Sequence, residues 1–170
     1  MSMTVDDLNR TDLATFVATL GSVYEHSPWV AERAAKARPF ASFDALHAAM
    51  SHVVAAAGDA QQLALIRAHP ELAGKAMVRK ELTADSTSEQ IGAGLTQCSP
   101  EELARLTALN ARYREKFGFP FILAVKGYDR AGVIAEFARR ADNDRANEFA
   151  ESLRQIDRIA RIRLEALLAD

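Results

Sequence analysis

Residues 133–170 read VIAEFARRADNDRANEFAESLRQIDRIARIRLEALLAD and contain neither glycine nor proline. Alanine, leucine, arginine and glutamate dominate this stretch and are strong helix formers. We therefore predict a shorter helix near residues 130–140 and a long terminal helix from about Asp142 or Asn143. Elsewhere breakers are also few, with 8 glycines and 5 prolines in 170 residues, and strand-like alternation is nearly absent. The sequence predicts an all-α fold, a single-domain bundle of roughly seven to nine helices over residues 1–170.

Serine and proline mark where other helices begin. Ser27-Pro28 predicts one start, with Ser27 as N-cap and Pro28 at the first helical position. Ser42 is predicted to cap the next helix. Ser99-Pro100-Glu101-Glu102 combines an N-cap, a first-position proline and a capping-box glutamate, and predicts a helix that runs to about Lys116.

Residues 117–127, FGFPFILAVKG, do not fit a plain helix. The segment is almost wholly apolar, but Gly118 and Pro120 interrupt it. An irregular apolar segment exposes backbone N–H and C=O groups that need hydrogen-bond partners. A bound ligand is one such partner.

Composition excludes several classes of function. The 21 basic and 23 acidic residues give a net charge of −2, which disfavours nucleic-acid binding. The single Cys98 excludes a disulfide scaffold, and the histidine spacings fit no metal site. No apolar run approaches the roughly 18 residues of a membrane helix, and no signal peptide is recognisable. We expect a cytoplasmic protein with no metal, nucleic-acid or membrane partner.

His69 and the stretch from Ser86 to Gln90 each allow two interpretations. His69 precedes Pro70 where a helix over residues 61–68 is predicted to end, so it is either a cation at a helix C-terminus or a proton-exchanging group. Ser86 as N-cap with Glu89 at N3 would form a capping box. The same helix start would also present N–H groups to an anionic ligand.

Arg163 is predicted to face the protein interior. On a helical wheel it falls about 20° from Ile156, inside the apolar stripe, whereas Arg154, Arg158 and Arg161 share the opposite face. A buried arginine costs several kcal/mol unless an anion pairs with it. That anion is either a ligand or a buried carboxylate such as Glu89, unless the side chain reaches solvent near the helix end.

Four motifs follow one another along the chain. They are His69-Pro70-Glu71-Leu72-Ala73-Gly74-Lys75, Ser86-x-x-Glu89-Gln90, Phe117-Gly118-Phe119-Pro120-Phe121-Ile122 and Ile159-Ala160-x-Ile162-Arg163-Leu164. In this order they closely resemble the OHCU decarboxylases (2-oxo-4-hydroxy-4-carboxy-5-ureidoimidazoline decarboxylases) of urate degradation. The resemblance runs from about residue 9 to 168, and Glu71 departs from it mildly, because the family more often has aspartate there.

The resemblance implies a cofactor-independent, all-helical homodimer that converts OHCU to (S)-allantoin and CO₂. His69 matches the family's catalytic proton donor, and Glu89 its partner in catalysis. The positions that match substrate-binding residues are Pro70, Ser86, Thr87, Ser88, Glu89, Gln90, Phe121, Ile122, Leu123, Ala124, Val125 and Arg163. Several contacts from Phe121–Val125 would come from the backbone, and Phe117, Phe119 and Phe121 could exclude water.

Two alternatives stay open from the sequence. An all-helical interaction module without catalysis would leave His69 and Glu89 as helix-cap residues. A related lyase or hydrolase on the same fold would act on another ureido compound. The sequence also leaves open an association with the upstream 5-hydroxyisourate hydrolase.

Overall fold

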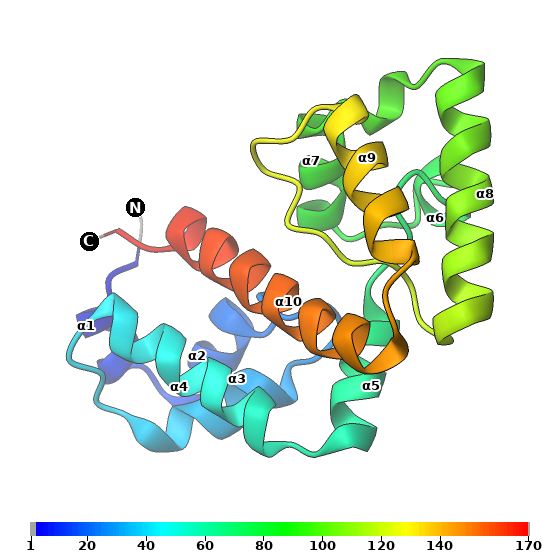
Figure 1. Ribbon diagram of the computed structural model, residues 1–170. Coiled ribbons are helices and arrows are strands. Elements are labelled where there is room, and N and C mark those ends of the chain that lie inside the picture. The colour runs from blue at the N-terminus through cyan, green and yellow to red at the C-terminus, as the bar shows by residue number, and fades with distance from the viewer. Residues whose placement is uncertain (1–2, 170) are drawn as a thin grey trace. The chain divides into compact units, whose positions relative to one another are not determined.

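The computed structural model describes residues 3–169, including every side chain in that range except those of residues 76 and 78 (Figure 1). The prediction of an all-helical fold is confirmed, and the one β-type pairing within 3–169 is an isolated bridge between Met3 and Leu168. The α-helices are α1 (Val5–Arg10), α2 (Leu13–Leu20), α3 (Trp29–Ala34), α4 (Phe43–Ala56), α5 (Asp59–Ala68), α6 (Lys75–Val78), α7 (Ala84–Gly92), α8 (Pro100–Phe117), α9 (Arg130–Ala141) and α10 (Arg145–Leu167). Two 3-10 turns, η1 (Ala35–Ala37) and η2 (Leu95–Gln97), complete the set.

The chain forms two compact units. One, here called the terminal unit, combines residues 1–68 with residues 157–170, and the other, the central unit, comprises residues 69–156. Helix α10 contributes its first half to the central unit and its second half to the terminal unit. That all 170 residues form one domain stays a prediction.

Two predicted helix starts are confirmed by their caps. The Ser42 hydroxyl accepts a hydrogen bond from the Ala45 N–H at 3.1 Å and opens α4. At α8 the Ser99 hydroxyl accepts from the Glu102 N–H while the Glu102 carboxylate accepts from the Ser99 N–H, a complete capping box. The helix ends at Phe117, followed by Gly118 at φ +78°, a conformation that glycine adopts without steric cost.

Three other starts lie elsewhere than predicted. Helix α3 begins at Trp29, and the Ser27 hydroxyl donates to the Glu25 carbonyl instead of capping. Helix α7 begins at Ala84 because Thr83, also a favoured N-cap residue, accepts from the Ser86 N–H. Helix α10 begins at Arg145, since Asp144 accepts from the Asn147 N–H and fixes the first turn there.

Aromatic rings fill the core of the central unit. Phe121 stacks on Phe137 with ring centroids 4.0 Å apart, and Tyr113 meets Phe121 edge-on at 5.5 Å. Phe117 and Phe119 pack against the same tyrosine, and all of these rings are buried. Residues 118–129 contain no helix, so the prediction of an irregular apolar segment is confirmed. The rings that were expected to keep water from a site are core residues of this unit.

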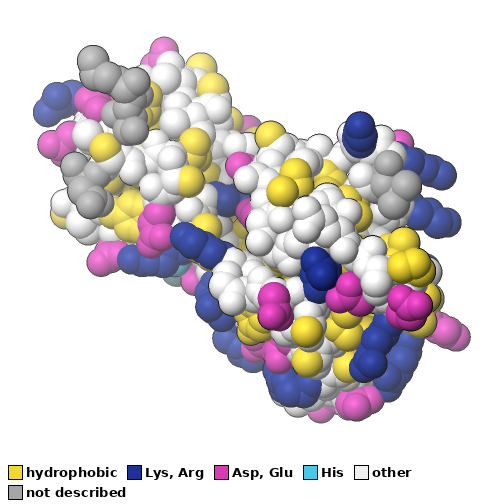
Figure 2. Space-filling model, turned by 90° about the horizontal axis from the view of Figure 1, so that it is seen from above, with side chains coloured by type: hydrophobic (Ala, Val, Ile, Leu, Met, Phe, Trp, Pro, Cys, Tyr) yellow, Lys and Arg dark blue, Asp and Glu magenta, His cyan; other side chains and the backbone are white. Residues whose placement is uncertain are grey.

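Charges are interspersed on the surface. On the face shown in Figure 2, Lys and Arg side chains alternate with Asp and Glu side chains, without a broad patch of either sign. Among residues 3–169, no helix is long and apolar enough to cross a membrane.

Candidate functional site

His69 directly follows α5 and begins a loop that the central unit holds firmly. Its side chain is buried. Three residues further on, the Leu72 carbonyl accepts a hydrogen bond from the Asn110 amide at 2.9 Å. Ala73 has φ +51°, a left-handed conformation that costs a non-glycine residue energy and needs support from its surroundings. His69 is therefore mounted on a well-supported loop at a helix exit.

Gln90 supplies much of that support. Its side-chain oxygen accepts from the Ala73 N–H at 2.9 Å, and its side-chain nitrogen donates to the Glu71 carbonyl at 3.3 Å. Gln90 is 2% exposed. The residue that was predicted to bind substrate thus braces the loop after His69, which leaves one amide hydrogen for any other contact.

Helix α7 presents only part of the predicted Ser86–Gln90 set on one face. At 100° per residue, Ser86, Glu89 and Gln90 share a face, and Ser86 and Gln90 are buried there. Thr87 and Ser88 are exposed. The Thr87 N–H donates to the Thr83 carbonyl within the helix. The fold therefore brings three of these five residues to the side of α7 that meets the His69 loop, and turns Thr87 and Ser88 away.

The segment Phe121–Val125 is buried along its whole length. Two side chains hold its backbone on either side of Leu123. Arg140 donates from Nη1 to the Ile122 carbonyl at 2.5 Å, and the Gln155 side-chain oxygen accepts from the Ala124 N–H at 3.0 Å. These two contacts give the Ile122 carbonyl and the Ala124 N–H the hydrogen-bond partners that the sequence predicts for an irregular apolar segment.

The backbone N–H and C=O of Leu123 provide one hydrogen-bond donor and one acceptor that Arg140 and Gln155 do not use. Because a trans peptide points its C=O and the next N–H in opposite directions, the Leu123 N–H faces away from Arg140 and the Leu123 C=O faces away from Gln155. Within residues 3–169 neither group has a hydrogen-bond partner, although Leu123 is 4% exposed. Buried backbone groups rarely stay unpaired, so this pair is suited to a ligand.

Helix α8 connects the loop and the segment. Asn110 binds the Leu72 carbonyl, and Tyr113, three residues later on the same face, packs against Phe121. Asn110 was missed by the sequence analysis. Its signal is that it interrupts the buried face of α8 that comprises Leu106, Leu109, Tyr113 and Phe117, the same argument that singled out Arg163.

Arg163 belongs to the terminal unit and is buried, as predicted. Its Nη2 donates to Glu25 Oε2 at 2.9 Å, and Glu25 is 1% exposed. The prediction that a buried arginine needs an anion is confirmed, but the carboxylate is Glu25 and not the suggested Glu89. Arg154, Arg158 and Arg161 are exposed, as the helical wheel predicts.

The fold and site define an all-helical protein that carries, in one unit, a buried histidine on a braced loop and a buried segment whose Leu123 N–H and C=O have no hydrogen-bond partner in the described part of the chain. The family model described as OHCU decarboxylase matches residues 9–165. A relative from Halalkalicoccus jeotgali named 2-oxo-4-hydroxy-4-carboxy-5-ureidoimidazoline decarboxylase is 43% identical over 165 residues, 97% of this chain and 92% of the relative. The chain belongs to the OHCU decarboxylase family, which confirms the resemblance seen in the sequence.

Larger proteins contain a similar region. The uric acid degradation bifunctional protein PucL of Bacillus subtilis is 43% identical over 167 residues. The matched region is 98% of this chain but only 33% of that relative. A crystal structure of (S)-allantoin synthase superposes with a TM-score of 0.80 at 32% identity, covering 98% of this chain and 54% of that one. The roles of individual site residues stay predictions.

Proposed function

We propose that this chain decarboxylates OHCU to (S)-allantoin in urate degradation, without a cofactor. The observation that carries the proposal is the family match over residues 9–165, which includes every predicted site residue. The buried His69 and the Leu123 backbone groups, which have no hydrogen-bond partner among the described residues, support a ligand site in the central unit.

The substrate supplies its own electron sink. One ring carbon carries a hydroxyl and a carboxylate, and the adjacent ring carbon is part of a C=N bond. When the bond to CO₂ breaks, its electron pair forms a C=C bond between the two carbons, and the imine nitrogen takes a proton. The second carbon then takes a proton on one face, while the hydroxyl loses its proton and becomes the ring carbonyl. No step needs pyridoxal phosphate or thiamine.

In this proposal His69 and Glu89 carry the protons. A rigidly held imidazole can give or take a proton near neutral pH, and a carboxylate is a suitable partner. The bracing of the His69 loop by Gln90 and Asn110 favours this role, because proton transfer to one face requires a fixed donor.

Backbone and charge would position the substrate. The Leu123 N–H and C=O form a donor and acceptor that match the amide edge of a ureido ring. Arg163 would bind the anionic group, with Glu25 orienting its guanidinium. Arg163 Nη1 also donates to the Ser22 and Val23 carbonyls at 3.4 Å, so these contacts and the ion pair with Glu25 fix the position of the guanidinium. We also propose that the chain forms a homodimer, which light scattering can test. Association with the upstream 5-hydroxyisourate hydrolase can be tested by co-purification.

The test is the rate at which freshly generated OHCU disappears, followed by ultraviolet absorbance. We expect the chain to accelerate the decay in proportion to its concentration, and His69→Asn to remove most of the acceleration. Decay at the spontaneous rate in the presence of folded chain would favour the interaction-module alternative. Acceleration with another ureido compound but not with OHCU would favour the related lyase or hydrolase.

A further inference from the structure

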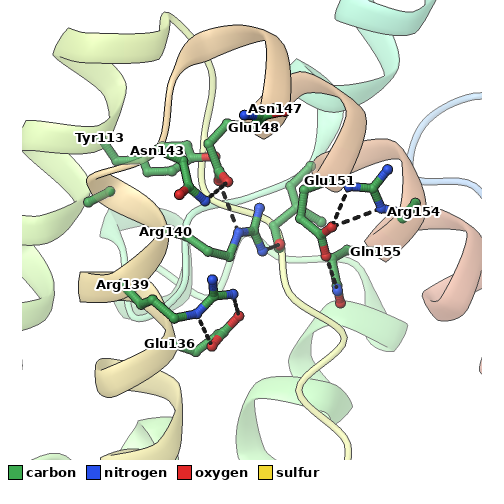
Figure 3. Close-up of polar contacts among 12 residues, drawn as sticks. Tyr113, Glu136, Arg139, Arg140, Asn143, Asn147, Glu148, Glu151, Arg154 and Gln155 are labelled. Carbon is green, nitrogen blue, oxygen red and sulfur yellow. Dashed lines mark hydrogen bonds and ion pairs between the residues drawn. The ribbon is translucent and has the colours of Figure 1, made fainter.

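A buried ionic network in the central unit lies against the Phe121–Val125 segment (Figure 3). Arg140 and Glu148 are both 0% exposed, and Arg140 Nε donates to Glu148 Oε1 at 2.9 Å. The same carboxylate accepts from the Tyr113 hydroxyl at 2.6 Å and from the Asn143 amide at 3.0 Å. Burial raises the pKa of Tyr113, so its hydroxyl keeps the proton that it donates.

Stability alone does not explain this network. Two buried charges lose their hydration, and replacing such a pair with apolar residues of similar size is often neutral or stabilising. Arg140 Nη2 is also buried without a hydrogen-bond partner within residues 3–169, which adds to the cost. The ion pair therefore has a second role, which follows from the backbone groups that it holds in position.

Arg140 holds the backbone next to Leu123. Its Nη1 binds the Ile122 carbonyl at 2.5 Å, and its guanidinium lies 4.5 Å from the centre of the Phe121 ring. Glu148 fixes the guanidinium through Nε, so one ion pair sets the orientation of one peptide plane. At the residue after Leu123, the Gln155 side-chain oxygen accepts a hydrogen bond from the Ala124 N–H. The Gln155 side-chain nitrogen in turn donates to the Glu151 carboxylate.

We propose that Arg140, oriented by Glu148, is a positioning residue for the substrate site. It fixes the Ile122–Leu123 peptide so that the Leu123 N–H faces away from the network and toward the ligand. Arg140 does not touch the substrate. This inference rests on the proposed function, because it assigns a role in binding the same substrate.

Helix α9 provides a matched control. Arg139, the neighbour of Arg140, pairs with the partly exposed Glu136 (Figure 3), and among residues 3–169 no hydrogen bond or ion pair joins Arg139 to the Phe121–Val125 segment. The test variant is Arg140→Met with Glu148→Gln, which removes both charges together so that no buried ion is left unpaired. Glutamine can still accept from Tyr113, and Asn143 can reverse its amide to match. The control variant is Arg139→Met with Glu136→Gln.

Two readouts are needed besides the melting temperature of each variant. The first is amide hydrogen exchange of residues 121–125, measured by mass spectrometry. The second is the steady-state kinetics of OHCU decarboxylation. We expect the test variant to unfold within a few degrees of the wild type, to exchange these amides faster, and to raise KM about 10- to 100-fold with a smaller fall in kcat. The control variant should match the wild type in all three respects.

The outcomes separate the two proposals. Unchanged exchange and unchanged KM in a folded test variant would overturn the positioning role. If the test variant does not fold, Gln155→Met decides, because it removes the acceptor for the Ala124 N–H and, besides that, one hydrogen bond that Gln155 donates to Glu151. A raised KM together with the melting temperature of the wild type then supports the inference, and a wild-type KM overturns it. A wild-type chain that does not turn over OHCU refutes the proposed function, while exchange still reports whether Arg140 holds the segment.

Discussion

At the scale of single residues, His69 and Glu89 have the most direct predicted role. We expect His69→Asn to lower kcat/KM by about 10²–10⁴-fold, the usual contribution of a positioned acid or base. Glu89→Gln should act in the same direction, and the double variant should be clearly less than additive because the two groups act on one proton path. A folded His69→Asn variant with wild-type turnover would return His69 to the role of a helix-terminal cation.

The ion pair of Arg163 with Glu25 changes what substitution of the arginine should do. A buried arginine without a partner could be replaced by methionine at no cost, but Arg163→Met removes the cation that lies 2.9 Å from the buried Glu25 carboxylate. We expect a loss of about 3–5 kcal/mol in the free energy of unfolding, measured by urea denaturation. Adding Glu25→Gln should restore most of the stability while KM stays raised.

Arg161→Met provides the comparison, since Arg161 is exposed on the same helix. It should change neither the stability nor KM. If Arg163→Met alone proves as stable as the wild type, the ion pair of Arg163 with Glu25 does not contribute to the free energy of unfolding. If the double variant has a wild-type KM, Arg163 has no role in binding the substrate.

Sequence periodicity predicts that a residue is buried, but not what it meets. The wheel placed Arg163 on an apolar face and so predicted an anion, yet Glu25 is 138 residues away and lies in a loop. No local pattern distinguishes it from the other carboxylates. Gln90 shows the same limit, because its motif position suggested a substrate contact and only the fold reveals that it braces the loop after His69.

At the scale of elements, helix α4 and the second half of α10 are joined by a pH-dependent contact in the terminal unit. His47 Nε2 lies 3.2 Å from Asp157 Oδ1, and Ser51 donates to the same oxygen. The hydrogen bond to Asp157 raises the pKa of His47 above its usual 6.5, and the hydrogen bond from His47 lowers the pKa of Asp157.

The sign of the effect follows from linkage. The stabilisation from His47 is fully present below its unfolded pKa and is lost as pH rises through its higher folded pKa. The stabilisation from Asp157 is present above its unfolded pKa, near 3.8, and is lost as pH falls through its lower folded pKa. We expect His47→Gln to reduce the fall in unfolding free energy between pH 6 and pH 9, measured by urea denaturation, and exposed His52→Gln to leave it unchanged. An identical pH profile for His47→Gln and the wild type would show that the contact does not contribute.

Helix starts were predictable where one cap dominates and not where two compete. Ser99 is followed by proline and a capping-box glutamate, so α8 could be predicted to within a residue. At α7 both Thr83 and Ser86 can cap, and the earlier one gives a helix that is longer by three residues. The irregular character of residues 118–129 was also predictable, from glycine and proline. Its partners Arg140 and Gln155 were not, because they come from α9 and α10.

At the scale of the whole molecule, the proposed chemistry requires no metal. The substrate carries its own electron sink, so activity should be unaffected by EDTA and by dialysis against metal-free buffer. The measurement is kcat/KM before and after treatment. Loss of activity that one specific metal restores would contradict the proposed mechanism.

The stereochemistry of the product tests the proposed function as a whole. Freshly generated OHCU is incubated with catalytic amounts of the chain, and the circular dichroism of the product is followed over time. We expect the signal of (S)-allantoin to grow at a rate proportional to the chain concentration, and to be strongly reduced with His69→Asn. Racemic allantoin formed at the spontaneous rate would show that this chain neither catalyses the decarboxylation nor directs the proton to one face.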